Sequence, residues 1–136
     1  MPKRVQRTRL KGQPAIPKGA VYVGRGRGDY GRWGNPFTVA DCLEADFAET
    51  EAEARQVVTE TYRNWLTGDM PATPEGDGTA WSAERRDWIR DHIGELTGKD
   101  LACWCKPPAP GEKDWCHASV LLEFAAHPKR LVACSA

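Results

Sequence analysis

Four side chains of the kinds that bind soft metals or attack electrophiles lie within fifteen residues of one another near the C-terminus. They are Cys103 and Cys105, on either side of Trp104, and the adjacent pair Cys116 and His117. No other part of the sequence concentrates as many such groups. The segment is therefore the first candidate for a metal site or for a reactive-thiol centre.

A metal site would use both halves of this segment. Alternation along a strand expected at 101–105 places the sulfurs of Cys103 and Cys105 on one side, and the loop before Cys116 is long enough to fold back. With His117 as the fourth ligand, these residues could form a tetrahedral zinc site. Adjacent residues at a helix start diverge by about 100°, however, which makes joint ligation by Cys116 and His117 awkward.

Two other interpretations of the same residues remain open. Cys116 at the start of a helix, beside the His117 imidazole, fits an activated thiol, which would make both residues catalytic. Alternatively, the cysteines are small buried hydrophobic residues and His117 caps the helix. A disulfide is not expected, because the chain has five cysteines and no export signal, so that its thiols should stay reduced.

Basic residues gather in the first quarter of the chain. Residues 1–33 contain nine Lys or Arg and one acid, Asp29, although the whole chain has a net charge of zero. Glycines and arginines alternate after a strand expected at 21–23, and exposed backbone N–H groups with arginine forks commonly hold phosphate. The expected anion site uses Arg4, Arg7, Arg25 and Arg32. The alternative is a solvated loop in a domain whose basic and acidic parts neutralise each other.

The segment 33–37, with the sequence Trp-Gly-Asn-Pro-Phe, follows this loop. The amide of Asn35 could hydrogen-bond to a base edge or a ribose, and the ring of Trp33 could stack on a base. The same residues could equally form a tight turn whose aromatic rings fill the core. The sequence favours neither interpretation.

Hydrophobic periodicity and turn residues predict the order of the elements. Helices are expected over 50–66, with Thr50 as the cap and Gly68 as the end, over 82–96, and from Asp114 or Cys116 onward; strands are expected at 21–23, 101–105 and 131–133, with an extended basic segment at 1–11 and a mobile loop at 68–80. This order predicts a small single α/β (or α+β) domain over 1–136, in which a short mixed sheet is flanked by about three helices.

Composition narrows the class of protein. The chain has 136 residues, of which 28% are charged, and a mean hydropathy of −0.60. No apolar run approaches the roughly 20 residues that a membrane span needs, and the basic N-terminus is not followed by the apolar stretch of a secretory signal. We therefore expect a cytoplasmic protein without a membrane partner.

Seven blocks, in order over nearly the whole chain, resemble the bacterial and phage family catalogued as domain of unknown function 4326. They are Arg-Val-Gln-Arg at 4–7, Val-Tyr-Val-Gly-Arg at 21–25, Trp-Gly-Asn-Pro-Phe at 33–37, the helix with Tyr62 and Trp65-Leu66, Gly-Lys-Asp-Leu at 98–101, Cys-Trp-Cys at 103–105 and Cys-His at 116–117. The resemblance implies a small stand-alone domain and no settled activity. This chain departs from the family pattern in a longer loop between Cys105 and Cys116 and in a Gly-Asp-Tyr-Gly insert before Arg32.

Together these features predict one polar pocket with the arginines and 33–37 on one wall and the cysteine–histidine cluster on the other. The expected ligand is a nucleotide or a nucleotide-like anionic metabolite, which the protein hydrolyses or from which it transfers a group. A competing class is a nucleic-acid-binding module, in which basic residues contact the backbone and aromatic rings stack on bases. An isoelectric point near 6.8 speaks against it. A third class is a non-catalytic accessory protein with a zinc-stapled core.

Overall fold

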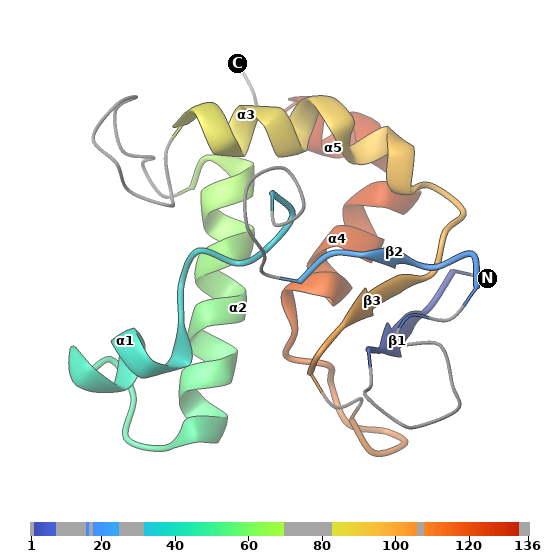
Figure 1. Cartoon of the computed structure of the whole chain (residues 1–136). Coiled ribbons are helices and arrows are strands. Elements are labelled where there is room, and N and C mark those ends of the chain that lie inside the picture. The colour runs from blue at the N-terminus through green and yellow to red at the C-terminus, as the bar shows by residue number, and fades with distance from the viewer. Residues whose placement is uncertain are drawn as a thin grey trace.

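The computed structural model of the protein describes residues 2–7, 16, 18–24, 32–69, 83–105 and 108–133. These residues form a small α/β domain in which helices pack against a short sheet (Figure 1). The elements are β1 (Arg4–Gln6), β2 (Val21–Tyr22), α1 (Val39–Glu44), α2 (Glu51–Thr67), α3 (Ala83–His92), a 3₁₀ turn η2 (Ile93–Leu96), β3 (Leu101–Cys103), α4 (His117–Ala126) and α5 (Pro128–Ala133). The expected fold class is confirmed.

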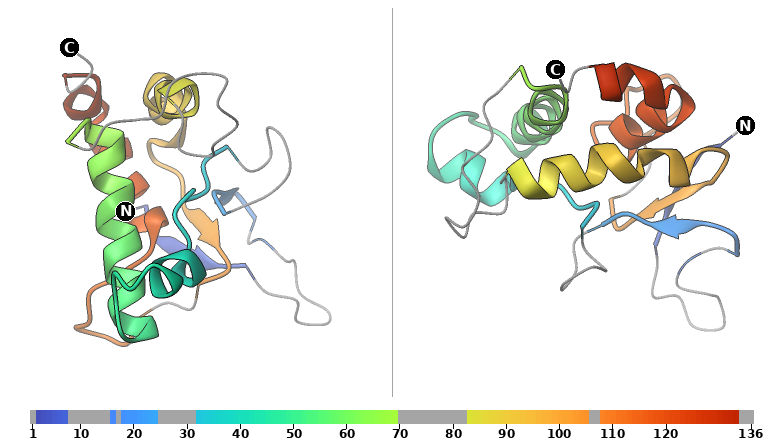
Figure 2. Two further views of the ribbon diagram at one scale, coloured as in Figure 1. Left: turned by 90° about the vertical axis from the view of Figure 1, so that its left-hand side faces the viewer. Right: turned by 90° about the horizontal axis from the view of Figure 1, so that it is seen from above.

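The sheet has the strand order β1-β3-β2, so that β3 lies in the middle. Both neighbours run parallel to β3, and Val5 and Tyr22 are each in register with Ala102. The described strands therefore form a parallel sheet rather than the expected mixed one. Because parallel strands end at the same edge, the end of β3 at Cys103 lies between the ends of β1 and β2. The left view of Figure 2 shows α2 and α4 on one side of this sheet.

The helix α2 forms one wall of the core. Its start is capped by Thr50, whose hydroxyl accepts a hydrogen bond from the Glu53 N–H at 3.1 Å, and it ends at Gly68, whose φ of 88° is left-handed. Both boundaries confirm the prediction, because an oxygen side chain before a helix and a glycine after it satisfy groups that the helix leaves unpaired. The fully buried side chains of α2 pack with those of α3, η2, β3, α4 and α5: Tyr62, Trp65, Leu66, Ile89, Ile93, Leu101, Leu121 and Leu131.

The end of the chain differs from the prediction. Residues 131–133, expected as a strand, belong to the helix α5, which Pro128 begins. Proline fits the first turn of a helix, because the N–H that it lacks has no partner there. Leu131 is fully buried in the core that α4 also lines. The run of three apolar residues is therefore part of a helix. The predicted element type was wrong because so short a run does not distinguish a helix from a strand.

Two further elements differ from the prediction. The short helix α1 was not predicted; Thr38 caps it by accepting a hydrogen bond from the Asp41 N–H at 3.1 Å. The helix expected over 82–96 is α3 from Ala83, followed by the 3₁₀ turn η2, and position 82 lies outside the described residues. Of the expected loop at 68–80, only its first two residues are described.

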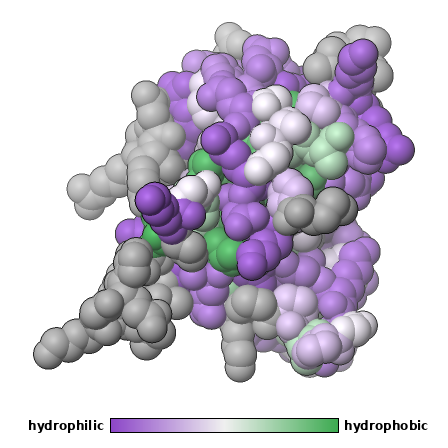
Figure 3. Space-filling view, turned by 90° about the vertical axis from the view of Figure 1, so that its right-hand side faces the viewer, coloured by the Kyte–Doolittle hydropathy of each residue, from purple (hydrophilic) through white to green (hydrophobic). Residues whose placement is uncertain are grey.

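The face in Figure 3 is largely hydrophilic, with small hydrophobic areas between polar side chains. None of the described helices combines the length and the hydrophobicity that a membrane crossing needs.

The buried hydroxyl of Tyr62 provides a test of the core. It donates a hydrogen bond to the Trp33 carbonyl at 2.8 Å, and Tyr62 is fully buried. Tyr62→Phe leaves this carbonyl without the hydroxyl, so the free energy of unfolding should fall by about 1–3 kcal/mol in urea denaturation. Thr61→Val, on the same helix, is the control and should change it by less than about 0.5–1 kcal/mol. An equal loss in both variants would contradict the role given to the Tyr62 hydroxyl.

Candidate functional site

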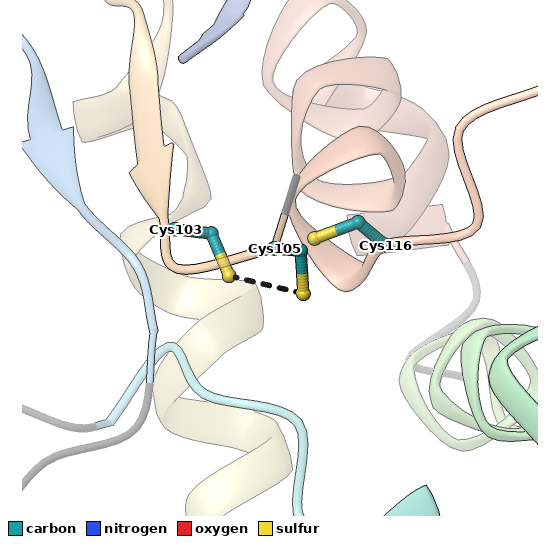
Figure 4. Close-up of side chains that lie close together, drawn as sticks. All are labelled: Cys103, Cys105 and Cys116. Carbon is teal, nitrogen blue, oxygen red and sulfur yellow. Dashed lines mark hydrogen bonds between the residues drawn. The ribbon is translucent and has the colours of Figure 1, made fainter. Parts of the chain in front are cut away.

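Three cysteine sulfurs converge at the carboxyl edge of the sheet. Cys103 ends β3, Cys105 lies in the turn that follows, and Cys116 directly precedes α4 (Figure 4). Their sulfur atoms all lie within 4.8 Å of one another, and those of Cys103 and Cys105 are 3.7 Å apart. Sulfurs bound tetrahedrally to one zinc ion, at about 2.3 Å each, would be about 3.8 Å apart. The three side chains could therefore hold a single metal ion.

A buried arginine ties the two halves of this cluster together. Arg4, on β1, donates from Nε to Asp114 Oδ2 at 2.5 Å and from a terminal nitrogen to Asp114 Oδ1 at 3.1 Å. Its other terminal nitrogen donates to the Cys105 carbonyl. The Arg4 side chain is only 4% exposed. Burial alone would lower the pKa of Arg4, but its hydrogen bonds to Asp114 and nearby negative charge raise it, so that the guanidinium stays charged.

Hydrogen bonds among the three thiols shift their pKa values in opposite directions. The pKa of Cys105 is lowered by hydrogen bonds from the thiols of Cys103 and Cys116, and further by the positive charge of Arg55. The pKa of Cys116 is raised by its hydrogen bonds to the other two sulfurs, and that of Cys103 by its hydrogen bond to Cys105. These interactions favour the thiolate of Cys105 over those of Cys103 and Cys116. A divalent cation supplies the charge that lets all three ionise.

His117 borders the cluster without joining the mutually close group. Its Nδ1 lies 3.8 Å from the Cys116 sulfur, and its Nε2 donates to the Val23 carbonyl at 2.6 Å. With the proton on Nε2, Nδ1 faces the Cys116 sulfur as an acceptor. Metal-bound histidines commonly have such a backbone partner, and a thiol–imidazole pair needs the same arrangement. Ligation by His117 and a catalytic role for Cys116 and His117 both stay predictions.

The cluster lines a pocket of about 400 Å³. The walls are aromatic, polar and apolar side chains from β2, α2 and the segments around the cysteines: Tyr22, Gly24, Asn35, Val39, Arg55, Val58, Thr59, Trp104 and Trp115, with Cys103, Cys105, Cys116 and His117. Gly24 admits the ring of Tyr22, because a Cβ at this position would lie 2.4 Å from the tyrosine oxygen. The pocket thus lies at the carboxyl edge of parallel strands, where open α/β sheets usually bind ligands.

Comparison with known proteins identifies the family. A family model described as "Domain of unknown function (DUF4326)" matches residues 5–127. The chain belongs to the DUF4326 family. No curated protein and no solved structure matches the chain. The match includes every residue of the cluster, and the description assigns no activity.

In this member of the DUF4326 family, the three predicted arginines that the structure describes, Arg4, Arg7 and Arg32, have different partners. Arg4 pairs with Asp114 beside the cluster. The guanidinium of Arg7 lies between two rings that line the pocket, 4.6 Å from the centre of Tyr22 and 4.8 Å from that of Trp104. The guanidinium of Arg32 lies 5.0 Å from the ring of Trp88 on α3, and Arg25 is outside the described residues. Phosphate binding by these four arginines stays a prediction.

The segment 33–37 forms the tight turn that was one of its two interpretations. Asn35 donates from Nδ2 to the Val58 carbonyl at 3.0 Å and accepts at Oδ1 from the Phe37 N–H at 2.9 Å. Trp33 is 8% exposed and packs edge-on against Trp88, with ring centres 4.9 Å apart. Asn35 also borders the pocket, whereas Trp33 belongs to the core. Their roles in ligand binding stay predictions.

Sequence reasoning missed several residues that line the pocket. Arg55 lies on α2 next to the buried Ala54, and Thr59 is one turn further on. The signal in the sequence was that Arg55 borders the apolar stripe with which α2 faces the core. Charged residues normally lie on the opposite face of such a helix. Trp104 and Trp115 also line the pocket, and each lies next to a cysteine of the cluster. For both tryptophans, the signal in the sequence was their position directly next to a candidate metal ligand.

Metal content tests the cluster directly. Protein purified under reducing conditions should contain about one metal ion per chain, and Cys105→Ala should remove most of it, because it deletes one of three converging sulfurs. Cys42→Ala is the matched control: Cys42 is also buried, but it lies on α1 in a separate hydrophobic cluster. Elemental analysis measures the ratio of metal to protein. Equal metal content in both variants would contradict the three-cysteine site.

The ion pair of Arg4 gives a second test. Asp114→Asn leaves a buried guanidinium without its charged partner, so the free energy of unfolding should fall by about 3 kcal/mol or more. Glu123→Gln is the control, because Glu123 pairs with Arg63 at 2.6 Å on the surface and the two side chains are 42% and 44% exposed. That change should cost less than about 1 kcal/mol. Similar values for the two variants in denaturant titrations would contradict the importance of the buried pair.

Proposed function

We propose that this pocket binds a nucleotide or a nucleotide-like anionic metabolite, and that the protein hydrolyses this ligand or transfers a group from it. The observation that carries the proposal is the shared lining of one cavity by the sulfur–imidazole cluster, by aromatic rings and by Arg55. Reactive groups, a surface for a flat ring and a positive charge are then available to one molecule. The volume of about 400 Å³ lies in the range of small-molecule sites.

Ring recognition in this proposal uses the aromatic walls. Trp104, Trp115 and Tyr22 line the pocket, and Trp104 is exposed enough, at 39%, to meet a ligand. Stacking of a base on such a side chain contributes about 1–3 kcal/mol and tolerates different bases. The Asn35 amide at the border of the pocket would help to orient the ring. Stacking would therefore not select one base, and the polar groups of the pocket would do so.

The chemistry in this proposal belongs to the cluster. Zinc is the metal proposed, because three thiolates suit it and it needs no redox partner. When bound, zinc would polarise a bond of the ligand or activate water. Cys116 and His117 lie at the start of α4, and we assign them the catalytic role at the bond that reacts. Reduced thiols require a reducing compartment, so the proposal includes a cytoplasmic location.

The alternative is a non-catalytic accessory protein in which the metal staples the core. The observation that favours it is burial: Cys103 is 4% exposed and Cys116 is 2% exposed, and they join β3 to α4. The nucleic-acid-binding class has weaker support, because the feature described here is a pocket of small-molecule size. Steeply salt-dependent binding of oligonucleotides would favour that class.

Ligand binding and turnover separate these functions. At least one of the four common nucleoside 5′-monophosphates should bind the metal-loaded protein with a Kd below about 1 mM in calorimetry, and a product should form in chromatographic assays of a nucleotide panel. Cys116→Ala should keep the circular dichroism of the folded protein and abolish turnover, whereas Cys42→Ala should keep both. Unfolding of Cys116→Ala would favour the stapled accessory protein, and the absence of any nucleotide binding would contradict the proposed function.

A further inference from the structure

Arg55 lies where two cavities meet. It lines the pocket above the cluster and also a neighbouring cavity of about 720 Å³, between the start of α2 and the segment 108–115. Trp115 is the other residue that lines both. A group bound by the Arg55 guanidinium would therefore lie between the two spaces.

Arg55 supplies the positive charge of the smaller pocket, whereas the larger cavity is also lined by Lys113 and by the acids Glu51, Glu112 and Asp114. Arg55 is the only lysine or arginine among the described residues that line the smaller pocket. Within the described ranges, the guanidinium forms no ion pair, although the side chain is half-buried. A partly desolvated guanidinium binds phosphate or carboxylate strongly, because its fork of donors matches two oxygens.

The other arginines near the pocket are engaged differently. Both Arg4 and Arg7 are next to the cluster, but the Arg4 guanidinium holds Asp114 and that of Arg7 lies between two rings. Arg55 also lines the same pocket as the three sulfurs, so that one small ligand in this pocket could contact both.

We propose that Arg55 is the anion-binding residue of this site and that it holds the phosphate of the ligand where the two cavities meet. The inference rests on the proposed function for the flat ring, which would lie in the smaller pocket over the cluster. The larger cavity would receive the substituent on the far side of the phosphate from the ring. The substrate class is then a phosphate ester or anhydride of a ring-bearing group.

The test compares Arg55→Gln with Arg63→Gln, a matched control that removes the same charge from the same helix. Arg63 pairs with Glu123 at 2.6 Å and lies outside both cavities. Calorimetry on the metal-loaded proteins uses three probes: the nucleoside 5′-monophosphate that binds wild type most tightly, its nucleoside, and inorganic pyrophosphate. Arg55→Gln should weaken the two phosphate probes about 10- to 100-fold and leave the nucleoside unchanged, and Arg63→Gln should change none of them.

Arg55→Lys is the second variant, and it should give an intermediate loss, because lysine keeps the charge but lacks the fork. Unchanged nucleotide affinity in Arg55→Gln would overturn the inference and leave the proposed function standing. Pyrophosphate binding that depends on Arg55, without any nucleotide binding, would support the anion site and overturn the nucleotide. If wild type binds no phosphate probe, or if Arg55→Gln loses its metal, the inference is wrong.

Discussion

The site depends on one buried interaction, the contact of Arg4 with Asp114 and with the Cys105 carbonyl. The two acceptors lie on the two segments that supply the cysteines: the turn after β3 and the stretch before α4. A guanidinium with a fork of fixed donors constrains both at once, and the burial of Arg4 makes the loss of either partner costly. The Arg4 contact thus constrains the two segments that bring the three sulfurs together.

Local signals predicted the parts of this structure that local interactions determine. Thr50 and Gly68 bound α2 as expected, and the sulfurs of Cys103 and Cys105 lie together as expected, although the strand predicted over 101–105 ends at Cys103 and Cys105 follows it in a bend. The failures have physical causes too. Leu131 belongs to a helix because tertiary packing, rather than β-propensity, decides a run of three apolar residues.

The roles of individual polar residues were harder to predict, because they depend on distant partners. Phosphate binding by Arg4 stays a prediction, but its partner Asp114, 110 residues away in the sequence, could not be foreseen. Asn35 has a partner at the Val58 carbonyl that exists only once α2 is in place. Arg55 was missed because helix periodicity describes a face of a helix and not the cavity that the face borders. Such contacts need the assembled fold.

The central claim is that Cys103, Cys105 and Cys116 share one metal ion. X-ray absorption spectroscopy at the metal edge, on protein purified under reducing conditions with zinc in the medium, tests it most directly. The account predicts about three sulfur neighbours at about 2.3 Å from the metal, with the remaining position filled by nitrogen or oxygen. A bound metal with only nitrogen and oxygen neighbours, or protein that retains no metal while all its thiols react freely, would contradict it.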